Sequence, residues 1–225
     1  MVSPAKSSSI SHPGGRFLTR SSGLLCLAFL AFALSASSQT VNLFPQNDGN
    51  AWARVSIPPG HAVNPVTQWH IYPSRHTILC DGNRGHEWLR FNRELRNFTF
   101  HVQWRFTSLP GSPKYNSGVF FRNSEDGTIW YQAQTSPEGG YIFGETPIDG
   151  KLTGFNELKN MTENRVKPAG QWNTYDIRCV AETCTLAVNG AVVNTIHNAG
   201  EKGYIGLEAE GYRIEFKDFK IQELP

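Results

Sequence analysis

Acidic residues are missing from the start of the chain, and an apolar run of membrane-spanning length is missing throughout. The first 38 residues contain no aspartate or glutamate but hold three cations, Lys6, Arg16 and Arg20. The apolar run Gly23–Leu34 follows these cations and is shorter than the roughly 20 residues that a spanning helix needs. A basic segment followed by a short apolar run is typical of a secretory signal.

Small residues at Ala36 and Ser38 suit a signal-peptidase site. We therefore predict a signal over residues 1–38 and a single mature domain over 39–225, beginning near Gln39. The alternative is an uncleaved signal that anchors the protein in the membrane. With the signal removed, we expect no membrane segment and an exported protein, periplasmic or extracellular.

An excess of basic residues is also lacking. The chain has 21 Lys and Arg against 19 Asp and Glu, and three of the cations belong to the predicted signal, so cleavage moves the formal charge from +2 to about −1. A nucleic-acid partner would call for a clustered basic surface. We expect no nucleic-acid partner.

Cysteines are few, with four in the chain, and Cys26 lies in the predicted signal. Cys179 and Cys184 flank the sequence VAET, and a two-residue turn at its centre would place them directly opposite each other on paired strands. Export to an oxidising compartment favours a disulfide between them, and the alternative is two small apolar side chains. Cys80 would be a lone buried thiol.

No long amphipathic helix is visible, and apolar residues instead recur with period two. In FTFHVQWRF, residues 98–106, five apolar side chains share one face, while His101, Gln103 and Arg105 point to the other, as in a strand with one side in the core. Other strand-like runs are separated by turn sequences such as the Asn189-Gly190 pair. The pattern predicts an all-β, two-sheet antiparallel sandwich of the jelly-roll kind.

Two segments do not follow the strand pattern. Residues 45–75 are rich in proline, glycine and histidine, and we expect an irregular N-terminal segment. Residues 144–170 form a connection too long for a simple hairpin, and loops of this length are usually functional lids or disordered segments.

Four strand-like segments carry polar faces without lysine. The residues predicted to face outward are His101, Gln103 and Arg105; Asn116, Gly118, Phe120 and Arg122; Trp130, Gln132 and Gln134; and Gly206, Glu208 and Glu210. Planar amides, guanidinium groups, carboxylates and aromatic rings are what a sugar-binding site uses. The alternative is that these are ordinary solvated faces.

These segments resemble the 3-keto-disaccharide hydrolase domains, exported bacterial proteins with a concanavalin A-like jelly-roll fold. The resemblance lies between Trp69 and Leu224, in the segments NFTFHVQWRF, NSGVFFR, QAQ, GQWNTYDIR, LAVNG and GYIGLEAEGYRIEFKDFKIQEL. Two positions depart from the family pattern. Members commonly have an acid-x-Gln pair where this chain has Gln132 and Gln134, and a Gln-x-His pair where it has Glu208 and Glu210, which indicates relocated acid and base groups or a changed substrate.

The resemblance implies an oligosaccharide or glycoside substrate whose glucose C3 carries a ketone. Cleavage then needs a base near C2, a cation or donor at the ketone oxygen, and an acid near the leaving oxygen. Glu208 or Glu210 is the expected base, and Arg122 or Arg105 the group that stabilises the enolate oxygen. The alternative for Arg122 is an ion pair with one of the glutamates that only joins adjacent strands.

Other polar and aromatic residues are expected to bind the sugar. They are Gln134, Gln132, Arg105, Gln103, His101, Asn116, Trp130, Glu145 and His86, with Glu87 and Asp149 as further rim candidates. A divalent metal held by histidine and carboxylates is an alternative electrophile. The sequence shows no compact ligand motif, so it assigns no metal, and it indicates no oligomeric state.

Two other functions fit the same fold. The first is a carbohydrate-binding module without chemistry, and the second is a cell-envelope interaction domain that displays its loops, because a jelly roll hosts unrelated functions.

Overall fold

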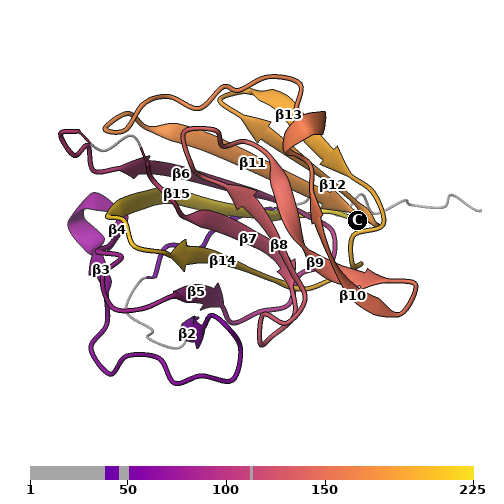
Figure 1. Ribbon diagram of the computed structural model, residues 1–225, viewed down its shortest axis with the longest axis horizontal. Helices are drawn as coiled ribbons and strands as arrows, with labels where there is room; N and C mark the ends of the chain where they lie inside the picture. The colour runs from indigo at the N-terminus through magenta and orange to yellow at the C-terminus, as the bar shows by residue number, and fades with distance from the viewer. Residues whose placement is uncertain (1–38, 46–50, 112–113) are drawn as a thin grey trace, which may run out of the picture. The chain divides into compact units, whose positions relative to one another are not determined.

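The period-two segments form two antiparallel sheets in the computed structural model, which describes residues 39–45, 51–111 and 114–225 (Figure 1). These residues belong to one compact unit that spans Ala36–Pro225. The predicted signal and Cys26 lie outside the described residues. Among the residues that are described, no helix is long and apolar enough to cross a membrane.

One sheet has eight strands and follows the order β13-β12-β11-β6-β15-β4-β3, with β1 pairing beside β15. Its strands are β1 (Thr40–Asn42), β3 (Trp69–Tyr72), β4 (Thr77–Cys80), β6 (Phe98–Phe106), β11 (Asn173–Val180), β12 (Thr183–Val188), β13 (Ala191–Ile196) and β15 (Ile214–Glu223). The other sheet has seven strands in the order β10-β9-β8-β7-β14-β5-β2. Its strands are β2 (Trp52–Ser56), β5 (Glu87–Phe91), β7 (Gly118–Asn123), β8 (Trp130–Gln134), β9 (Ile142–Ile148), β10 (Lys151–Asn156) and β14 (Tyr204–Ala209).

The core lies between the inner faces of the two sheets, as the alternation predicted. The five apolar side chains of β6 are at most 3% exposed, and its polar side chains are partly exposed on the other face. Val119, Phe121, Tyr131, Ala133 and Leu207 belong to the same core and come from the seven-stranded sheet. The two-sheet sandwich is confirmed.

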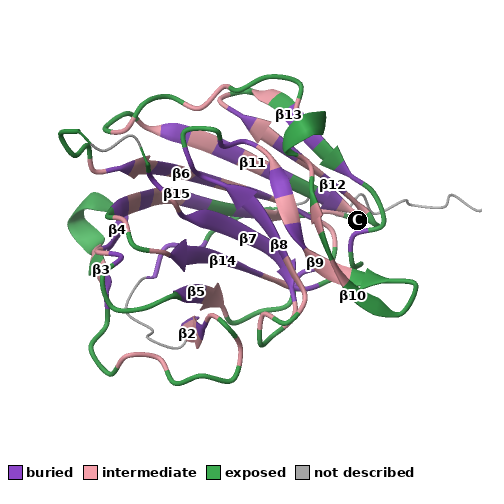
Figure 2. Ribbon diagram, in the orientation of Figure 1, coloured by how far each residue is buried: buried purple, intermediate pink, exposed green. Residues whose placement is uncertain are grey.

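The seven-stranded sheet differs from an ordinary sandwich sheet because its central strands are covered on both faces. All six residues of β7 are buried, and so are five of the six residues of β14 (Figure 2). A strand with one wet face would alternate between buried and exposed residues. Side chains therefore cover the outer face of this sheet as well.

The two segments predicted to be irregular contain more regular structure than expected. Residues 45–75 include β2, β3 and the short 3-10 helix η1 (Pro73–Arg75). β2 and β3 are edge strands of four or five residues, too short for a period-two pattern to stand out. Between them, residues 57–68 are irregular.

The predicted long connection at 144–170 is wrong in its first half. Part of β9, then β10 and the 3-10 helix η2 (Leu158–Asn160), occupy residues 144–160. The hairpin turns at Asp149 and Gly150, which both have positive φ (51° and 75°). An Asp-Gly pair is a strong hairpin signal, so this turn is visible in the sequence itself.

The predicted pairing of the two late cysteines is confirmed. Cys179 and Cys184 face each other in the β11–β12 register and form a disulfide, with their Cα atoms 4.2 Å apart. The Asn189-Gly190 hairpin is also confirmed, with both residues at positive φ. Cys80 is a free buried thiol, and burial raises the pKa of its side chain to about 12.

Candidate active site

A cavity of about 680 Å³ opens on the outer face of the seven-stranded sheet. Five aromatic side chains line it: Trp88, Phe120, Trp130, Tyr141 and Phe143. Trp130 meets both Phe120 and Phe143 edge to face, at interplanar angles of 87° and 89°. The cavity thus has flat, rigid apolar surfaces of the kind on which a sugar ring packs.

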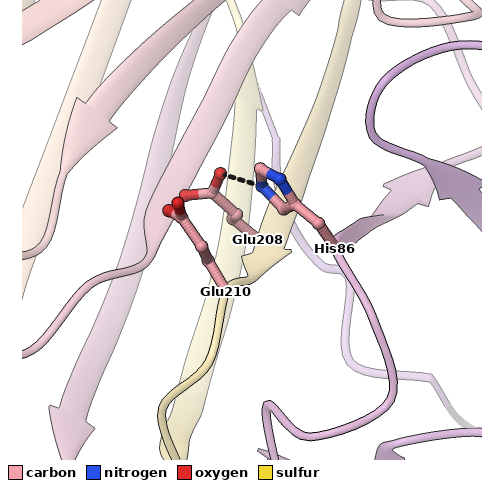
Figure 3. A group of neighbouring side chains, drawn as sticks. All are labelled: His86, Glu208 and Glu210. Carbon is pink, nitrogen blue, oxygen red and sulfur yellow. Dashed lines mark hydrogen bonds and ion pairs between the residues drawn. The ribbon is translucent and has the colours of Figure 1, made fainter.

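Three titratable side chains meet inside the cavity. Glu208 lies on β14, Glu210 follows that strand, and His86 immediately precedes β5 (Figure 3). Glu208 pairs with Trp88 across the β14–β5 register. Because alternate residues of a strand share a face, Glu210 and His86 are brought to the same side as Glu208.

The three groups are in close contact. His86 Nε2 lies 2.8 Å from Glu208 Oε1, and one nitrogen or oxygen atom from each of the three residues lies within 4.8 Å of the others. Figure 3 shows the two carboxylates turned toward each other, with the imidazole beside Glu208. We call these residues, His86, Glu208 and Glu210, the His-Glu-Glu cluster.

Side-chain amides connect the two carboxylates of the cluster. Gln132 Nε2 donates to Glu208 Oε2 at 2.8 Å and to Gln134 Oε1 at 3.0 Å. Gln134 Nε2 donates to Asn116 Oδ1 at 2.7 Å, and Asn116 Nδ2 donates to Glu210 Oε2 at 2.6 Å. This amide chain fixes the orientation of both carboxylates.

A glycine makes room for the amide chain. A Cβ atom on Gly118 would lie 2.2 Å from Nε2 of Gln132, across the β7–β8 pair. Any larger residue there would collide with Gln132. The absence of a side chain on β7 is therefore what lets Gln132 reach Glu208.

Burial and charge shift the pKa values of two members of the cluster. Burial alone would lower the pKa of His86, but the hydrogen bond and negative charge of Glu208 outweigh it, and the pKa is raised. Burial, and after it the charge of Glu208, raises the pKa of Glu210. His86 and Glu210 therefore hold their protons more readily than the same side chains in water.

Arg122 does not share this wall, and its predicted placement is wrong. The register between β14 and β7 shifts between Tyr204 and Gly206, and Arg122 adopts a positive φ of 57°. This bulge breaks the period-two alternation, so that Asn123, not Arg122, lines the cavity.

The Arg122 guanidinium lies inside the protein and is 1% exposed. It donates to three main-chain carbonyl oxygens, those of Ala181, Gly200 and Arg96. Burial lowers its pKa to about 10. Neither the predicted enolate-stabilising role nor the alternative ion pair with a glutamate is present.

The three outward residues of β6 lie on the other sheet. His101, Gln103 and Arg105 are on the outer face of the eight-stranded sheet, so their predicted grouping with the glutamates is wrong. Arg105 pairs with Glu215 at 3.0 Å. Alternation shows which face of its own sheet a residue occupies, but it does not show to which sheet the strand belongs.

His101 and its neighbours form a separate ionic group. Its Nδ1 lies 2.7 Å from Asp176 and its Nε2 3.2 Å from Asp218. The hydrogen bond to Asp176 is the main cause that raises the pKa of His101.

Most of the other predicted site residues do line the cavity. Trp130 and Glu145 face each other across β8 and β9 and both belong to the lining. Glu87 does not, because it is 2% exposed and bonded to Arg54, Gln68 and Trp69. Asp149 lies at the β9–β10 turn and lines a different cavity.

Several lining residues were not predicted. Trp88, Asn123, Tyr141 and Phe143 are among them. Every second residue of a strand points to the same face. Counting in twos from His86 reaches Trp88, and counting in twos from Glu145 reaches Phe143 and Tyr141. This alternation, which we call parity, could therefore have found all three from the sequence. Asn123 is reached only when the bulge is known.

Comparison with known proteins gives one family and a set of structural neighbours. A family model described as "3-keto-alpha-glucoside-1,2-lyase-like domain" matches residues 39–222. The match begins 30 residues before Trp69, where the resemblance between sequence segments began. No curated protein matches the chain.

Solved structures match the whole sandwich at low identity. A Parabacteroides distasonis protein, provisionally assigned as a glycosyl hydrolase, has a TM-score of 0.59 and 16% identity over 83% of this chain and 94% of its own. The carbohydrate-binding module CBM66 from Bacillus subtilis has a TM-score of 0.54 and 12% identity over 77% and 96%.

LamA from Z. galactanivorans, solved with laminaritriose and laminaritetraose, has a TM-score of 0.56 and 8% identity over 82% of this chain and 98% of its own. At these identities the likeness shows the fold alone. The fold is the concanavalin A-like jelly roll.

Proposed function

Because the chain belongs to the 3-keto-alpha-glucoside-1,2-lyase-like domain family, we propose that it cleaves 3-keto-glycosides, including 3-keto-disaccharides, in the cavity of the seven-stranded sheet. The observation that carries the proposal is the convergence of His86, Glu208 and Glu210 inside an aromatic-walled cavity. Titratable groups with shifted pKa values in a cleft are typical of catalytic sites. A second basis is the volume of about 680 Å³, which lies in the range of ligand-binding cavities.

The chemistry follows from the ketone at C3 of the substrate. The ketone acidifies the proton on C2, so a carboxylate can remove it and leave an enolate. The electrons of the enolate then expel the aglycone oxygen from C1, which forms a C1–C2 double bond. The carboxyl group returns its proton to the leaving oxygen, and addition of water across the double bond gives the 3-keto-sugar.

The cavity offers three carboxylates for the proton transfer, those of Glu145, Glu208 and Glu210. Both oxygens of Glu208 already accept hydrogen bonds, from His86 and Gln132. Glu208 is therefore a positioning group, and the base is Glu145 or Glu210.

The aromatic wall and the amide chain hold the sugar in place. Trp130 and Phe143 provide perpendicular faces against which a ring can pack. A hydrogen bond between Gln134 and Asn116 holds both residues in the amide chain. The nitrogen of each amide carries a second hydrogen with which it can donate to a sugar hydroxyl group. LamA was solved with bound oligosaccharides, which supports a carbohydrate ligand for this fold.

We also propose that the protein acts after export, with residues 1–38 as the signal that directs it. The periplasm or the cell exterior is where a protein with such a signal meets oligosaccharides. Mass spectrometry of the protein purified from its producing cell would show a mature chain beginning near Gln39. An intact N-terminus in the secreted fraction would contradict cleavage.

The cleavage reaction is tested with a chromogenic 3-keto-glucoside that carries deuterium at C2. Elimination predicts release of the aglycone together with loss of the deuterium to water. The unoxidised glucoside serves as control and should remain intact, because its C2 proton is not acidic. Cleavage of both compounds at similar rates, or retention of the deuterium, would contradict the mechanism, and sugar binding without any release would favour a carbohydrate-binding module.

A further inference from the structure

The charge of the cavity does not match the reaction proposed for it. An enolate needs positive charge at the ketone oxygen, but the described residues that line the cavity include no lysine or arginine. The lining instead holds three glutamates and His86. Arg122, the cation expected from the sequence, donates its hydrogen bonds to main-chain carbonyls elsewhere.

The His-Glu-Glu cluster has the geometry of a cation site. One ligand atom of each residue lies within 4.8 Å of the others. Nitrogen and oxygen ligands about 2.0–2.2 Å from one ion lie roughly 3–4 Å from each other. Small side-chain rotations would therefore bring all three atoms onto a single ion.

The amide chain binds one oxygen of each glutamate and leaves the other oxygen available to an ion. Gln132 holds Oε2 of Glu208, and Asn116 holds Oε2 of Glu210. Oε1 of Glu208 already faces His86 Nε2 at 2.8 Å. Hydrogen bonds to the outer oxygens of ligating carboxylates are the usual support of a metal site.

His101 also lies beside two carboxylates, but these carboxylates do not point toward a common centre. Asp176 and Asp218 lie at opposite ring nitrogens of His101, and Lys220 pairs with Asp218 at 2.7 Å. Their oxygens are separated by the ring, so no common point exists for an ion. His101 is therefore a matched control for His86.

We propose that His86, Glu208 and Glu210 bind a divalent transition-metal ion. One imidazole and two carboxylates suit ions from Mn²⁺ to Zn²⁺. The role of the ion rests on the proposed function: it would stabilise the developing enolate oxygen as a Lewis acid. With Glu210 engaged as a ligand, Glu145 is the carboxylate of the lining that remains to act as the base.

Binding is tested without substrate. The protein is dialysed against EDTA, the chelator is removed, and Mn²⁺ and Zn²⁺ are titrated separately in a calorimeter. We expect one ion per chain, with binding weakened at least about tenfold in His86→Gln and Glu210→Gln and unchanged in His101→Gln. Absence of saturable binding of both ions, or equal affinity in wild type and the cluster variants, would overturn the proposal.

Folding of the variants is checked by thermal unfolding. An ion that binds only the folded state raises Tm, so Mn²⁺ or Zn²⁺ should raise Tm of wild type and of His101→Gln but not of Glu210→Gln. Gln132→Met keeps all three ligands and loses one supporting hydrogen bond, and it should bind the ion about tenfold more weakly. Wild-type affinity in Gln132→Met would contradict the support assigned to the amide chain, and with it the argument from oriented oxygens.

The two proposals can fail separately. Ion binding that is lost in the cluster variants, without cleavage of any 3-keto-glycoside, would leave the metal site and remove the function. Undiminished cleavage by the EDTA-treated protein, with no ion bound, would leave the function and remove the metal site. Loss of cleavage in EDTA that Mn²⁺ or Zn²⁺ restores would support both.

Discussion

Arg122 is a buried cation that forms no ion pair with a carboxylate among the described residues. Its charge is compensated by carbonyl oxygens of three separate segments, including that of Ala181 at 3.0 Å. The Cζ atom of its guanidinium lies over the ring of Phe98, 5.8 Å from the ring centroid. One side chain thus ties the end of β7 to the β11–β12 turn and to the loop before β14, and we assign it a role in stability rather than in catalysis.

Replacement of Arg122 should therefore cost stability. Arg122→Ala removes a buried side chain and its hydrogen bonds to three main-chain carbonyl oxygens, and we expect the free energy of unfolding to fall by about 3 kcal/mol. Arg105→Ala is the matched control, because Arg105 forms a partly exposed ion pair worth about 1 kcal/mol or less. Urea unfolding followed by fluorescence measures both, and equal losses would contradict the assigned role.

Among single residues, the sequence located most of the charged and amide side chains that line the cavity and misplaced the arginine. Parity placed Asn116, Gln132, Gln134, Glu208 and Glu210 on one face, and all five line the cavity. Parity fails at Arg122 because one residue with positive φ reverses the alternation that follows it. That backbone conformation depends on carbonyl groups far away in the sequence, and a local pattern contains no information about them.

Strands β7 and β8 set the position of the amide chain. Gly118 and Gln134 face each other in the register, and the side chain of Gln132 occupies the space above Gly118. Gln132 is only 2% exposed, so the neighbouring side chains hold its amide in place beside Glu208.

A methyl group at Gly118 should therefore reduce activity. In Gly118→Ala the new Cβ would lie 2.2 Å from Gln132 Nε2, which forces the amide away from Glu208. We expect kcat/KM for a 3-keto-glucoside to fall about 10- to 100-fold. Gly154→Ala on β10 is the control, because its Cβ would meet only a carbonyl oxygen 3.8 Å away; similar activity in both variants would show that the amide position is not needed.

Strands β6, β11 and β15 bring the second histidine between two aspartates. The register pairs His101 with Asp176 on one side and with Lys220 on the other. The hydrogen bond and charge of Asp176, with those of Asp218, raise the pKa of His101 above its usual value. A group whose pKa is raised on folding stabilises the folded state when it is protonated.

This raised pKa predicts a pH dependence of stability. The contribution of His101 is fully present below its unfolded pKa of about 6.5 and is lost as the pH rises through its higher folded pKa. Wild type should therefore lose more stability between pH 6 and pH 8.5 than His101→Gln does. Free energies of unfolding at the two pH values measure this difference, and identical losses would contradict it.

The sequence predicted the strands better than their sheet membership. FTFHVQWRF was identified as a half-buried strand, and β6 has that alternation. Its polar face was nevertheless grouped with those of β7, β8 and β14. Strand order is set by long-range pairing, such as that of β6 with β11 and β15, and periodicity is the same whichever sheet a strand joins.

The two outer faces of the sandwich differ in what they present. The seven-stranded sheet has buried central strands and a cavity with a His-Glu-Glu cluster. The eight-stranded sheet presents ion pairs, including Arg105 with Glu215 and His101 with Asp176. The polar residues that the sequence placed in one site are therefore divided between two surfaces with the core between them.

This division predicts that substitutions on the two faces affect different quantities. His101→Gln combined with Arg105→Gln should leave kcat/KM for a 3-keto-glucoside at the wild-type value, because both side chains lie on the eight-stranded sheet, away from the cavity.

His86→Gln should reduce kcat strongly, because it removes one member of the cluster at which the sugar is proposed to react. Trp130→Ala should instead raise KM by about tenfold at most, since a lost aromatic contact costs about 0.5–1.5 kcal/mol. Steady-state kinetics separates these outcomes, and a loss of kcat/KM in the double variant with an unchanged free energy of unfolding would place the active site on the eight-stranded sheet.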